Sequence, residues 1–223
     1  MDDYFNPKLN LDYFKAEKGK KALRRSSYIE KIRQQELYLE FNNTENGLFI
    51  YDLEFAQKTM ENIQKNNNQP DMLGIQFKDG KPEKLILLEV KSTKAAMTDG
   101  KGKDGKEKSG LIKHIEGMEE YKKDPEAIKN RIIEVNKILK QYKDLELRII
   151  KDVEEISDIP IEIRVILTDS TDDGAVDYFM RNKKYYENKE NGDSKNLSKI
   201  LDEKGYEFKV IKEDRIEIYP KNR

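Results

Sequence analysis

The sequence predicts a single α/β domain in which a mixed central β-sheet is flanked by helices. Residues 48 to 123 contain three short apolar segments, separated by turn-forming residues and followed by segments with helical periodicity. A further apolar segment, at residues 161 to 167, returns to the strand pattern and is the expected later core strand. A chain of 223 residues can bury a substantial core, and we expect one domain over residues 1 to 223.

The first expected helix begins near Ser26 or Ser27, either of which can cap it, and ends at about Phe41. Four residues at helical spacing trace its expected inner face: Tyr28, Ile32, Gln35 and Leu39. This face is only moderately apolar, so the helix is expected to cover the sheet without dominating the core.

Three strands are expected after this helix, at residues 48 to 55, 72 to 77 and 85 to 91. Turn-forming residues at 78 to 82 join the second strand to the third, which predicts an antiparallel meander. The third strand is apolar on both of its faces for most of its length. This is typical of a central strand that is covered by helices on both sides.

The rest of the chain is expected to be mainly helical, with a second group of strands. Ser109 can cap a helix, and Asp124-Pro125 begins a longer one. The apolar side of the first of these helices consists of Leu111, Ile112, Ile115, Met118 and Tyr121. After the strand at 161 to 167, the expected elements are helical segments near 175 to 187 and 194 to 203 and a strand pair around 206 to 219.

Composition excludes several classes of protein. The chain has 43 Lys and Arg against 44 Asp and Glu, so net charge does not by itself indicate a nucleic-acid-binding protein. It has no cysteine, which excludes disulfides and thiolate metal sites. No apolar segment approaches the length that crosses a membrane, and the first residues lack the features of a secretory signal. We therefore expect a cytoplasmic protein with no membrane partner.

One group of charged residues stands at the ends of two apolar strands. Pro70-Asp71 precedes the strand at 72 to 77, and Glu89-Val90-Lys91 closes the strand at 85 to 91. Strand side chains alternate between faces, so Glu89 and Lys91 share one face, and the hairpin returns Asp71 to the same end. Burial of unpaired charges is energetically costly, so charged residues at the ends of these apolar strands indicate a functional site. A metal ion and a phosphate would satisfy both kinds of charge.

This pattern of Pro-Asp, strand, turn, strand and Glu-x-Lys resembles the PD-(D/E)xK nuclease superfamily. The resemblance implies a restriction-endonuclease-like fold in which Asp71, Glu89 and the Val90 carbonyl bind Mg²⁺ or Mn²⁺. Lys91 would orient or deprotonate the attacking water, or stabilise the charged phosphorane. It implies metal-dependent hydrolysis of phosphodiester bonds, and we expect DNA as substrate and endonuclease action. RecB-like members carry a glutamine four residues before a tyrosine, whereas Gly117 stands four residues before Tyr121 here.

Further residues are candidates for roles around this site. An additional carboxylate from an earlier helix or strand would be Glu36, Glu40 or Glu54, and the sequence does not choose among them. Candidates for contact with nucleic acid are Lys94, which begins a lysine-rich stretch, and the neighbouring Lys113 and His114. The alternative for the lysine-rich stretch is a solvated surface loop.

Other interpretations remain open at the level of the sequence. Glu89 and Lys91 could form an ordinary ion pair at a strand end, with Asp71 in a turn. A separate alternative is a catalytically silent nucleic-acid-binding or assembly subunit with the same fold, whose metal site is vestigial or structural. An RNA-directed nuclease is a further alternative, because nothing in the sequence recognises a 2′-hydroxyl. A homodimer would suit a double-strand cut, since one site cleaves one strand.

Overall fold

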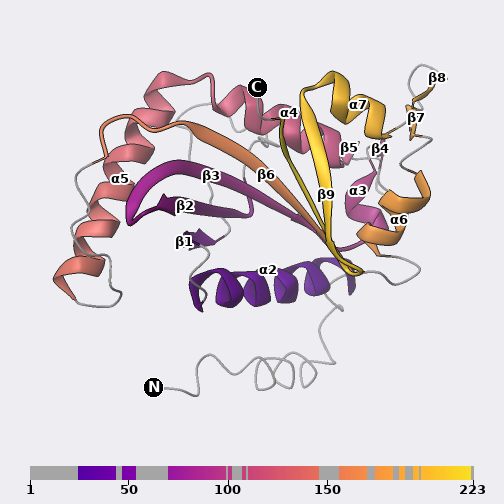
Figure 1. Ribbon diagram of the computed structural model, residues 1–223. Helices are drawn as coiled ribbons and strands as arrows, with labels where there is room; N and C mark the ends of the chain where they lie inside the picture. Colours follow the sequence, from indigo (N-terminus) through magenta and orange to yellow (C-terminus); the bar gives the residue numbers. More distant parts are fainter. Residues whose placement is uncertain are drawn as a thin grey trace.

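The computed structural model places six strands in one sheet, with helices on both faces (Figure 1). The described residues are 25–43, 47–53, 70–98, 100–101, 107–108, 110–145, 156–169, 174–182, 186–188, 193–195 and 197–221. The strands of the large sheet are β1 (Leu48–Leu53), β2 (Met72–Lys78), β3 (Lys81–Lys91), β6 (Ile161–Thr168), β9 (Tyr206–Lys212) and β10 (Arg215–Pro220). The helices are α2 (Arg25–Asn43), α3 (Lys94–Met97), α4 (Leu111–Tyr121), α5 (Pro125–Asp144), α6 (Ala175–Asn182) and α7 (Leu197–Glu203).

The sheet is mixed, as the sequence predicts, and most of its pairings are antiparallel. Its strand order is β1-β2-β3-β6-β10-β9. The first three strands form the predicted antiparallel meander. β3 and β6 run parallel, and the chain between them contains α4 and α5. This agrees with the long, helical connection that parallel strands require. The mixed α/β class is therefore confirmed, while the extent of the domain stays a prediction.

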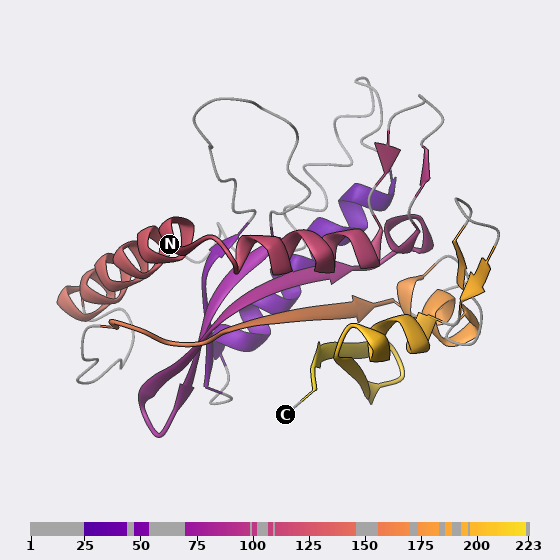
Figure 2. The same cartoon turned by 90° about the horizontal axis from the view of Figure 1, so that it is seen from above.

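Helices cover the sheet on both faces, so β3 is buried on both sides. On one face, Leu111 and Ile115 of α4 pack in the same cluster as Leu87 of β3. On the other face, Leu37 and Phe41 of α2 pack with the alternate residues of β3. Figure 2 shows α4 and α2 lying across the strands between them. β3 is the predicted central strand, because its alternation sends apolar side chains to both layers.

The β2–β3 hairpin is tighter than the sequence analysis proposed. Its loop consists of Asp79 and Gly80, with φ values of 51° and 77°. Positive φ at both central residues is typical of a two-residue hairpin loop, for which Asp-Gly is a favoured pair. β3 therefore starts at Lys81, and Pro82 lies within the strand instead of in the turn. A register shift between Gln76 and Phe77 accommodates the pairing there.

The inner face of α2 differs from the predicted one. Gln34, Leu37 and Phe41 are buried, whereas Gln35, which was expected to face inward, is exposed. The helix also begins at Arg25, so the serines expected to cap it lie inside its first turn. The helix is rotated because Leu37 and Phe41 present the larger apolar surface to the sheet.

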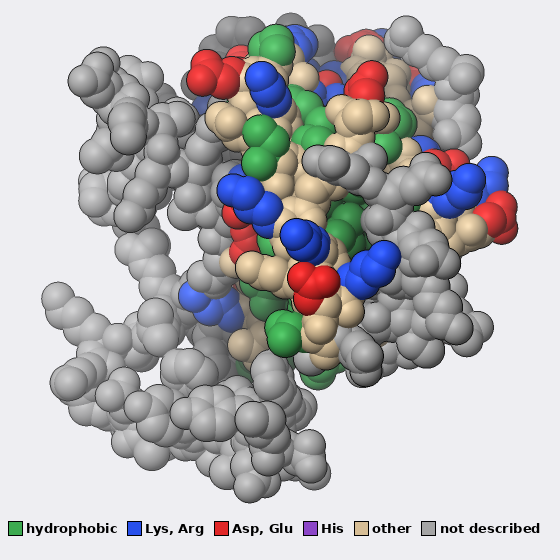
Figure 3. Space-filling model, turned by 90° about the vertical axis from the view of Figure 1, so that its left-hand side faces the viewer, with side chains coloured by type: hydrophobic (Ala, Val, Ile, Leu, Met, Phe, Trp, Pro, Cys, Tyr) green, Lys and Arg blue, Asp and Glu red, His purple; other side chains and the backbone are tan. Residues whose placement is uncertain are grey.

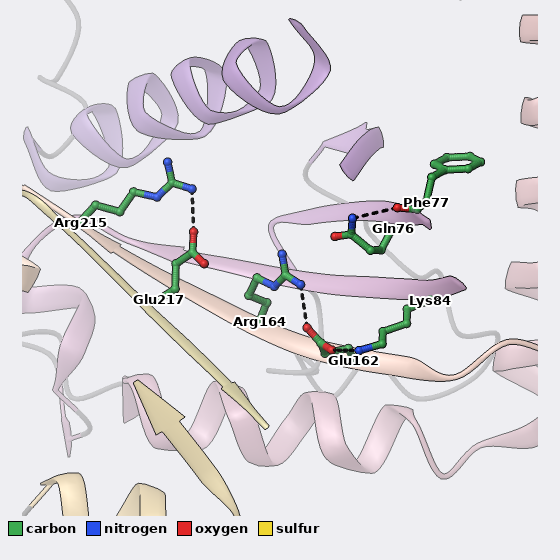
Figure 4. Close-up of polar contacts among 7 residues, drawn as sticks. All are labelled: Gln76, Phe77, Lys84, Glu162, Arg164, Arg215 and Glu217. Atoms are coloured by element: carbon green, nitrogen blue, oxygen red, sulfur yellow. Dashed lines mark hydrogen bonds and ion pairs between the residues drawn. The ribbon is translucent and has the colours of Figure 1, made fainter. Parts of the chain in front are cut away.

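The contacts of Arg215 hold α2 in this orientation. The Arg215 guanidinium lies 5.1 Å from the centre of the Phe41 ring, and its Nη1 lies 2.6 Å from Glu40 Oε1. The same side chain contacts Glu217 on its own strand at 2.7 Å (Figure 4). β10 is therefore joined to α2 through one buried arginine.

Two of the later predictions need correction. Tyr186–Asn188 forms a short strand, β7, which pairs with β8 (Asp193–Lys195), where the sequence analysis expected helix. In the sequence, Asn188, Asn191 and Gly192 have low helix propensity, which disfavours a helix through this stretch. In addition, α4 has Gly110 at its N-cap, while Ser109 lies outside the described residues. Two-residue strands β4 (Gly100–Lys101) and β5 (Glu107–Lys108) pair within the lysine-rich stretch.

Charges of both signs are interspersed on the surface and along the two central strands of the sheet. Glu162 of β6 lies between Lys84, at 2.8 Å, and Arg164, at 2.7 Å, which joins β3 to β6 (Figure 4). The face in Figure 3 likewise carries basic and acidic side chains side by side. Among the described residues, no helix is long and apolar enough to cross a membrane.

Candidate functional site

Asp71, Glu89 and Lys91 lie at one end of the β2–β3 hairpin. The antiparallel register pairs Met72 with Leu88, so Asp71 and Glu89 follow at the same end. The Val90 N–H donates a hydrogen bond to Asp71 Oδ2 at 2.7 Å, which joins the start of β2 to the end of β3. The structure thus brings together Glu89 and Lys91, which strand alternation places on one face, and Asp71, which the hairpin returns to the same end.

Glu89 is the most enclosed member of the site, with 1% of its side chain exposed. Its Oε1 lies 2.5 Å from Lys91 Nζ and 2.8 Å from His114 Nδ1. Its Oε2 is buried and has no hydrogen-bond partner among the residues that the structure describes. An unpaired buried carboxylate oxygen is costly, which makes Oε2 the atom in the site most in need of a ligand.

The ionisation of these groups is strongly coupled. Burial raises the pKa of Asp71 well above its usual value, and the nearby charge of Glu89 raises it further. Burial also acts to raise the pKa of Glu89, but Lys91 and His114 outweigh it, so this pKa is lowered. The pKa of Lys91 is raised despite burial, because Glu89 and Asp71 favour its charged form. The site therefore contains one stable ion pair and one carboxylate that resists ionisation.

The sequence analysis did not identify Glu30 of α2 as a member of this region. The charge of Glu30 contributes to raising the pKa values of both Asp71 and Lys91. It is partly buried and lies on the same helical stripe as Gln34, Leu37 and Phe41. A correct phase for this helix, with Leu37 and Phe41 facing inward, would have pointed to Glu30.

The structure does not place the three glutamates that were candidates for an additional metal-binding carboxylate, Glu36, Glu40 and Glu54, in the site. Glu36 is exposed and pairs with Arg33 at 2.6 Å, while Glu40 pairs with Arg215 of β10. Glu54 lies outside the described residues. Neither Glu36 nor Glu40 is among the charges that shift the pKa values of the site, so Glu30 replaces them as the candidate.

The donor set fits a hard divalent cation held by few protein ligands. Asp71 and Glu89 are like charges in a desolvated site, and Glu89 Oε2 is unpaired within the described part of the chain. Mg²⁺ is commonly held by one or two carboxylates while its remaining ligands are water. Within the described ranges, no group of three or more His, Asp or Glu side chains is arranged to hold a metal ion. The Val90 carbonyl as a further ligand stays a prediction.

The basic residues predicted to contact nucleic acid are distributed differently. His114 lies inside the site, where its Nδ1 contacts Glu89, so its first role is with a carboxylate. Lys113 precedes it on α4 and is half-buried. Lys94 is exposed on α3, with its Nζ 5.9 Å from the centre of the Tyr178 ring. Of these three candidates, Lys94 is the exposed one, and it lies beyond the end of β3.

Comparisons of the chain with protein-family models, with curated proteins and with solved structures find no match.

Proposed function

We propose that this protein is a metal-dependent nuclease of the PD-(D/E)xK type, with a restriction-endonuclease-like core and DNA as its favoured substrate. One observation carries the proposal. A buried glutamate, Glu89, contacts Lys91 and His114 through one oxygen, while its second oxygen has no hydrogen-bond partner in the described residues and its charge raises the pKa of Asp71. Such an arrangement suits the binding of a cation next to a fixed ammonium group.

Phosphodiester hydrolysis needs a nucleophile and compensation for negative charge on the phosphate oxygens. A bound Mg²⁺ or Mn²⁺ would supply an activated water and charge compensation. Asp71 and Glu89 would hold it. His114 and Lys91 both contact Oε1 of Glu89, and so keep Oε2 oriented for the ligand.

The surroundings of Lys91 favour some of its possible catalytic roles over others. Its pKa is raised, so the ammonium form persists at neutral pH. A charged lysine cannot accept a proton from water, but it can orient a water molecule or stabilise the negative charge on phosphorus-bound oxygens. Of the roles considered from sequence, we therefore favour orientation and electrostatic stabilisation over deprotonation.

The experiment is to incubate purified protein with supercoiled double-stranded DNA and circular single-stranded DNA in Mg²⁺, Mn²⁺ or EDTA. We expect metal-dependent cutting that falls by about 100-fold or more in Asp71→Asn and Lys91→Gln. Glu83→Gln is the matched control, because it changes a carboxylate at the far end of the same strand, 4.0 Å from Lys78. Circular dichroism checks that each variant folds. Cutting that persists in EDTA or in Asp71→Asn would contradict the proposal.

A catalytically silent nucleic-acid-binding subunit is the second candidate. The close contact between Lys91 and Glu89 favours it, because this ion pair already satisfies both charges in part without a metal. Binding of DNA without cutting of DNA or RNA, under every metal condition, would support this second candidate. Cutting of RNA circles alone would instead indicate an RNA-directed nuclease.

A further inference from the structure

β9 is an open edge of the large sheet. Among the described strands only β10 pairs with it, and it lies at the margin of the molecule in Figure 2. Val210 and Ile211 are apolar but have 48% and 42% of their surface exposed. The free edge of a strand presents unpaired N–H and C=O groups, which can pair with another strand. The edge therefore combines exposed apolar side chains with free backbone groups.

We propose that β9 pairs antiparallel with β9 of a second copy of this chain, around a two-fold axis through Phe208. The two six-stranded sheets would then form one continuous sheet. This inference does not rest on the proposed nuclease activity, because it concerns a different edge of the sheet and uses none of the residues of the site.

The sequence of β9 selects this register. Facing residues in an antiparallel pair point to the same side of the sheet, so the two-fold axis between identical strands passes through a residue. With the axis at Phe208, Glu207 faces Lys209 of the second copy, and Lys209 faces Glu207 of the second copy. Two pairs of opposite charge form by symmetry. Tyr206 and Val210 face each other across the same interface.

Neighbouring registers are less favourable. An axis at Glu207 or at Lys209 places like charges directly opposite each other, which destabilises a strand pair. An axis at Val210 brings the partner strand onto the irregularity beside Ile211, where the register between β9 and β10 shifts. Phe208 is also held in place by an edge contact with Phe179, with ring centres 4.9 Å apart. It therefore offers a rigid centre for the interface.

A second copy is the partner that the charges of this edge fit. Glu207 and Lys209 are exposed, and neither takes part in an ion pair within the described ranges. Lysine on an edge strand commonly prevents pairing with another strand. Here Lys209 has a glutamate opposite it in the proposed register, while Lys212 is the last residue of β9 and faces a position before the first residue of β9 in the second copy. The net charge of -1 also means that two copies repel each other only weakly.

The test is sedimentation analysis of the full chain over a range of concentrations. We expect the unchanged protein to dimerise, and Glu207→Lys and Lys209→Glu to weaken dimerisation by about tenfold or more, because each places like charges opposite each other. A mixture of the two single variants should form a heterodimer, since positions 207 and 209 then face each other with opposite charges in both pairs. The double variant should recover the homodimer for the same reason.

Glu213→Lys is the control, because it makes the same charge change in the turn just outside the paired residues. A monomeric unchanged protein, a dimer that ignores both single variants, or single variants whose mixture stays monomeric would each overturn the proposal. Because the measurement reports association alone, its outcome is separate from the outcome of the cleavage assay.

Discussion

At Asp71, burial and a neighbouring carboxylate act in the same direction, and both oppose ionisation. The charge of Lys91 and the Val90 N–H, which donates a hydrogen bond to Asp71 at 2.7 Å, act against this rise in pKa. Glu89 is different, because Lys91 and His114 lower its pKa although it is more deeply buried. Two carboxylates at the same end of one hairpin thus have opposite ionisation tendencies, which is a common feature of functional sites.

We predict that Asp71→Asn stabilises the metal-free protein at neutral pH. The pKa of Asp71 in the folded state lies above the unfolded value of about 3.9. Protonated Asp71 therefore contributes fully to the free energy of unfolding below about pH 3.9. This contribution is lost as the pH rises through the folded pKa. Asparagine avoids the charge and can still accept the Val90 N–H. We expect a gain on the order of 1 kcal/mol, or about 2–4 °C in Tm, in EDTA at pH 7.

Thermal unfolding of both proteins between pH 3.5 and 8 measures this difference. The gain should disappear toward the acid end, where Asp71 itself is protonated in both states. Glu83→Gln serves as the comparison on the same strand and should show no such pH-dependent gain. A lower Tm for Asp71→Asn at pH 7 would show that the charged form is already well compensated without a metal.

At the scale of elements, the sequence predicts where a helix begins better than it predicts which face of the helix packs on the sheet. Asp124 accepts hydrogen bonds from the N–H groups of Glu126 and Ala127, at 3.1 and 3.0 Å, and Pro125 occupies the first turn. This start of α5 was predicted, because capping depends on adjacent residues alone. The predicted inner face of α2 was wrong, because the buried face of a helix depends on how the helix packs on the sheet.

Asp124→Ala is expected to destabilise the protein by about 1 kcal/mol, since it leaves two backbone donors at the start of α5 without an acceptor. The measurement is chemical denaturation followed by far-ultraviolet circular dichroism. Asp124→Ser keeps a side-chain acceptor and should recover most of the loss. Equal destabilisation by alanine and serine would mean that the cap contributes through charge rather than through its hydrogen bonds.

At the scale of the whole molecule, β2, β3, α2 and α4 all contribute to one site. Asp71 and Glu89 come from the hairpin, Glu30 from α2, and His114 from α4. A ligand that binds only when these elements are assembled must stabilise the folded state by mass action. Binding of a metal ion should therefore raise the free energy of unfolding of the whole folded domain.

We predict that Mg²⁺ or Mn²⁺ at about 100 times its dissociation constant raises the Tm by roughly 5–10 °C. This corresponds to about 2.7 kcal/mol of linked binding energy for a chain of this size. The increase should be reversed by EDTA and absent in Glu89→Gln. Differential scanning calorimetry with a series of metal concentrations provides the measurement.

His114→Ala should retain this effect with weaker metal affinity, by about 10- to 100-fold, because the imidazole positions Glu89 without binding the ion. His114→Gln, whose amide can reach the same carboxylate, should recover part of the affinity. An unchanged Tm of the natural protein at every metal concentration would remove the basis for a metal site.

The sequence by itself determined the local parts of this protein. The hairpin and the convergence of Asp71, Glu89 and Lys91 follow from strand alternation and turn chemistry, which act between near neighbours. The structure shortened the predicted turn at 78 to 82 to Asp79 and Gly80. Only the tertiary structure decided the contributions of Glu30 and His114, the parallel pairing of β3 with β6, and the position of β9 at the edge. These depend on which helix face and which strand pack together, and that choice is made by the burial of apolar surface across the whole chain.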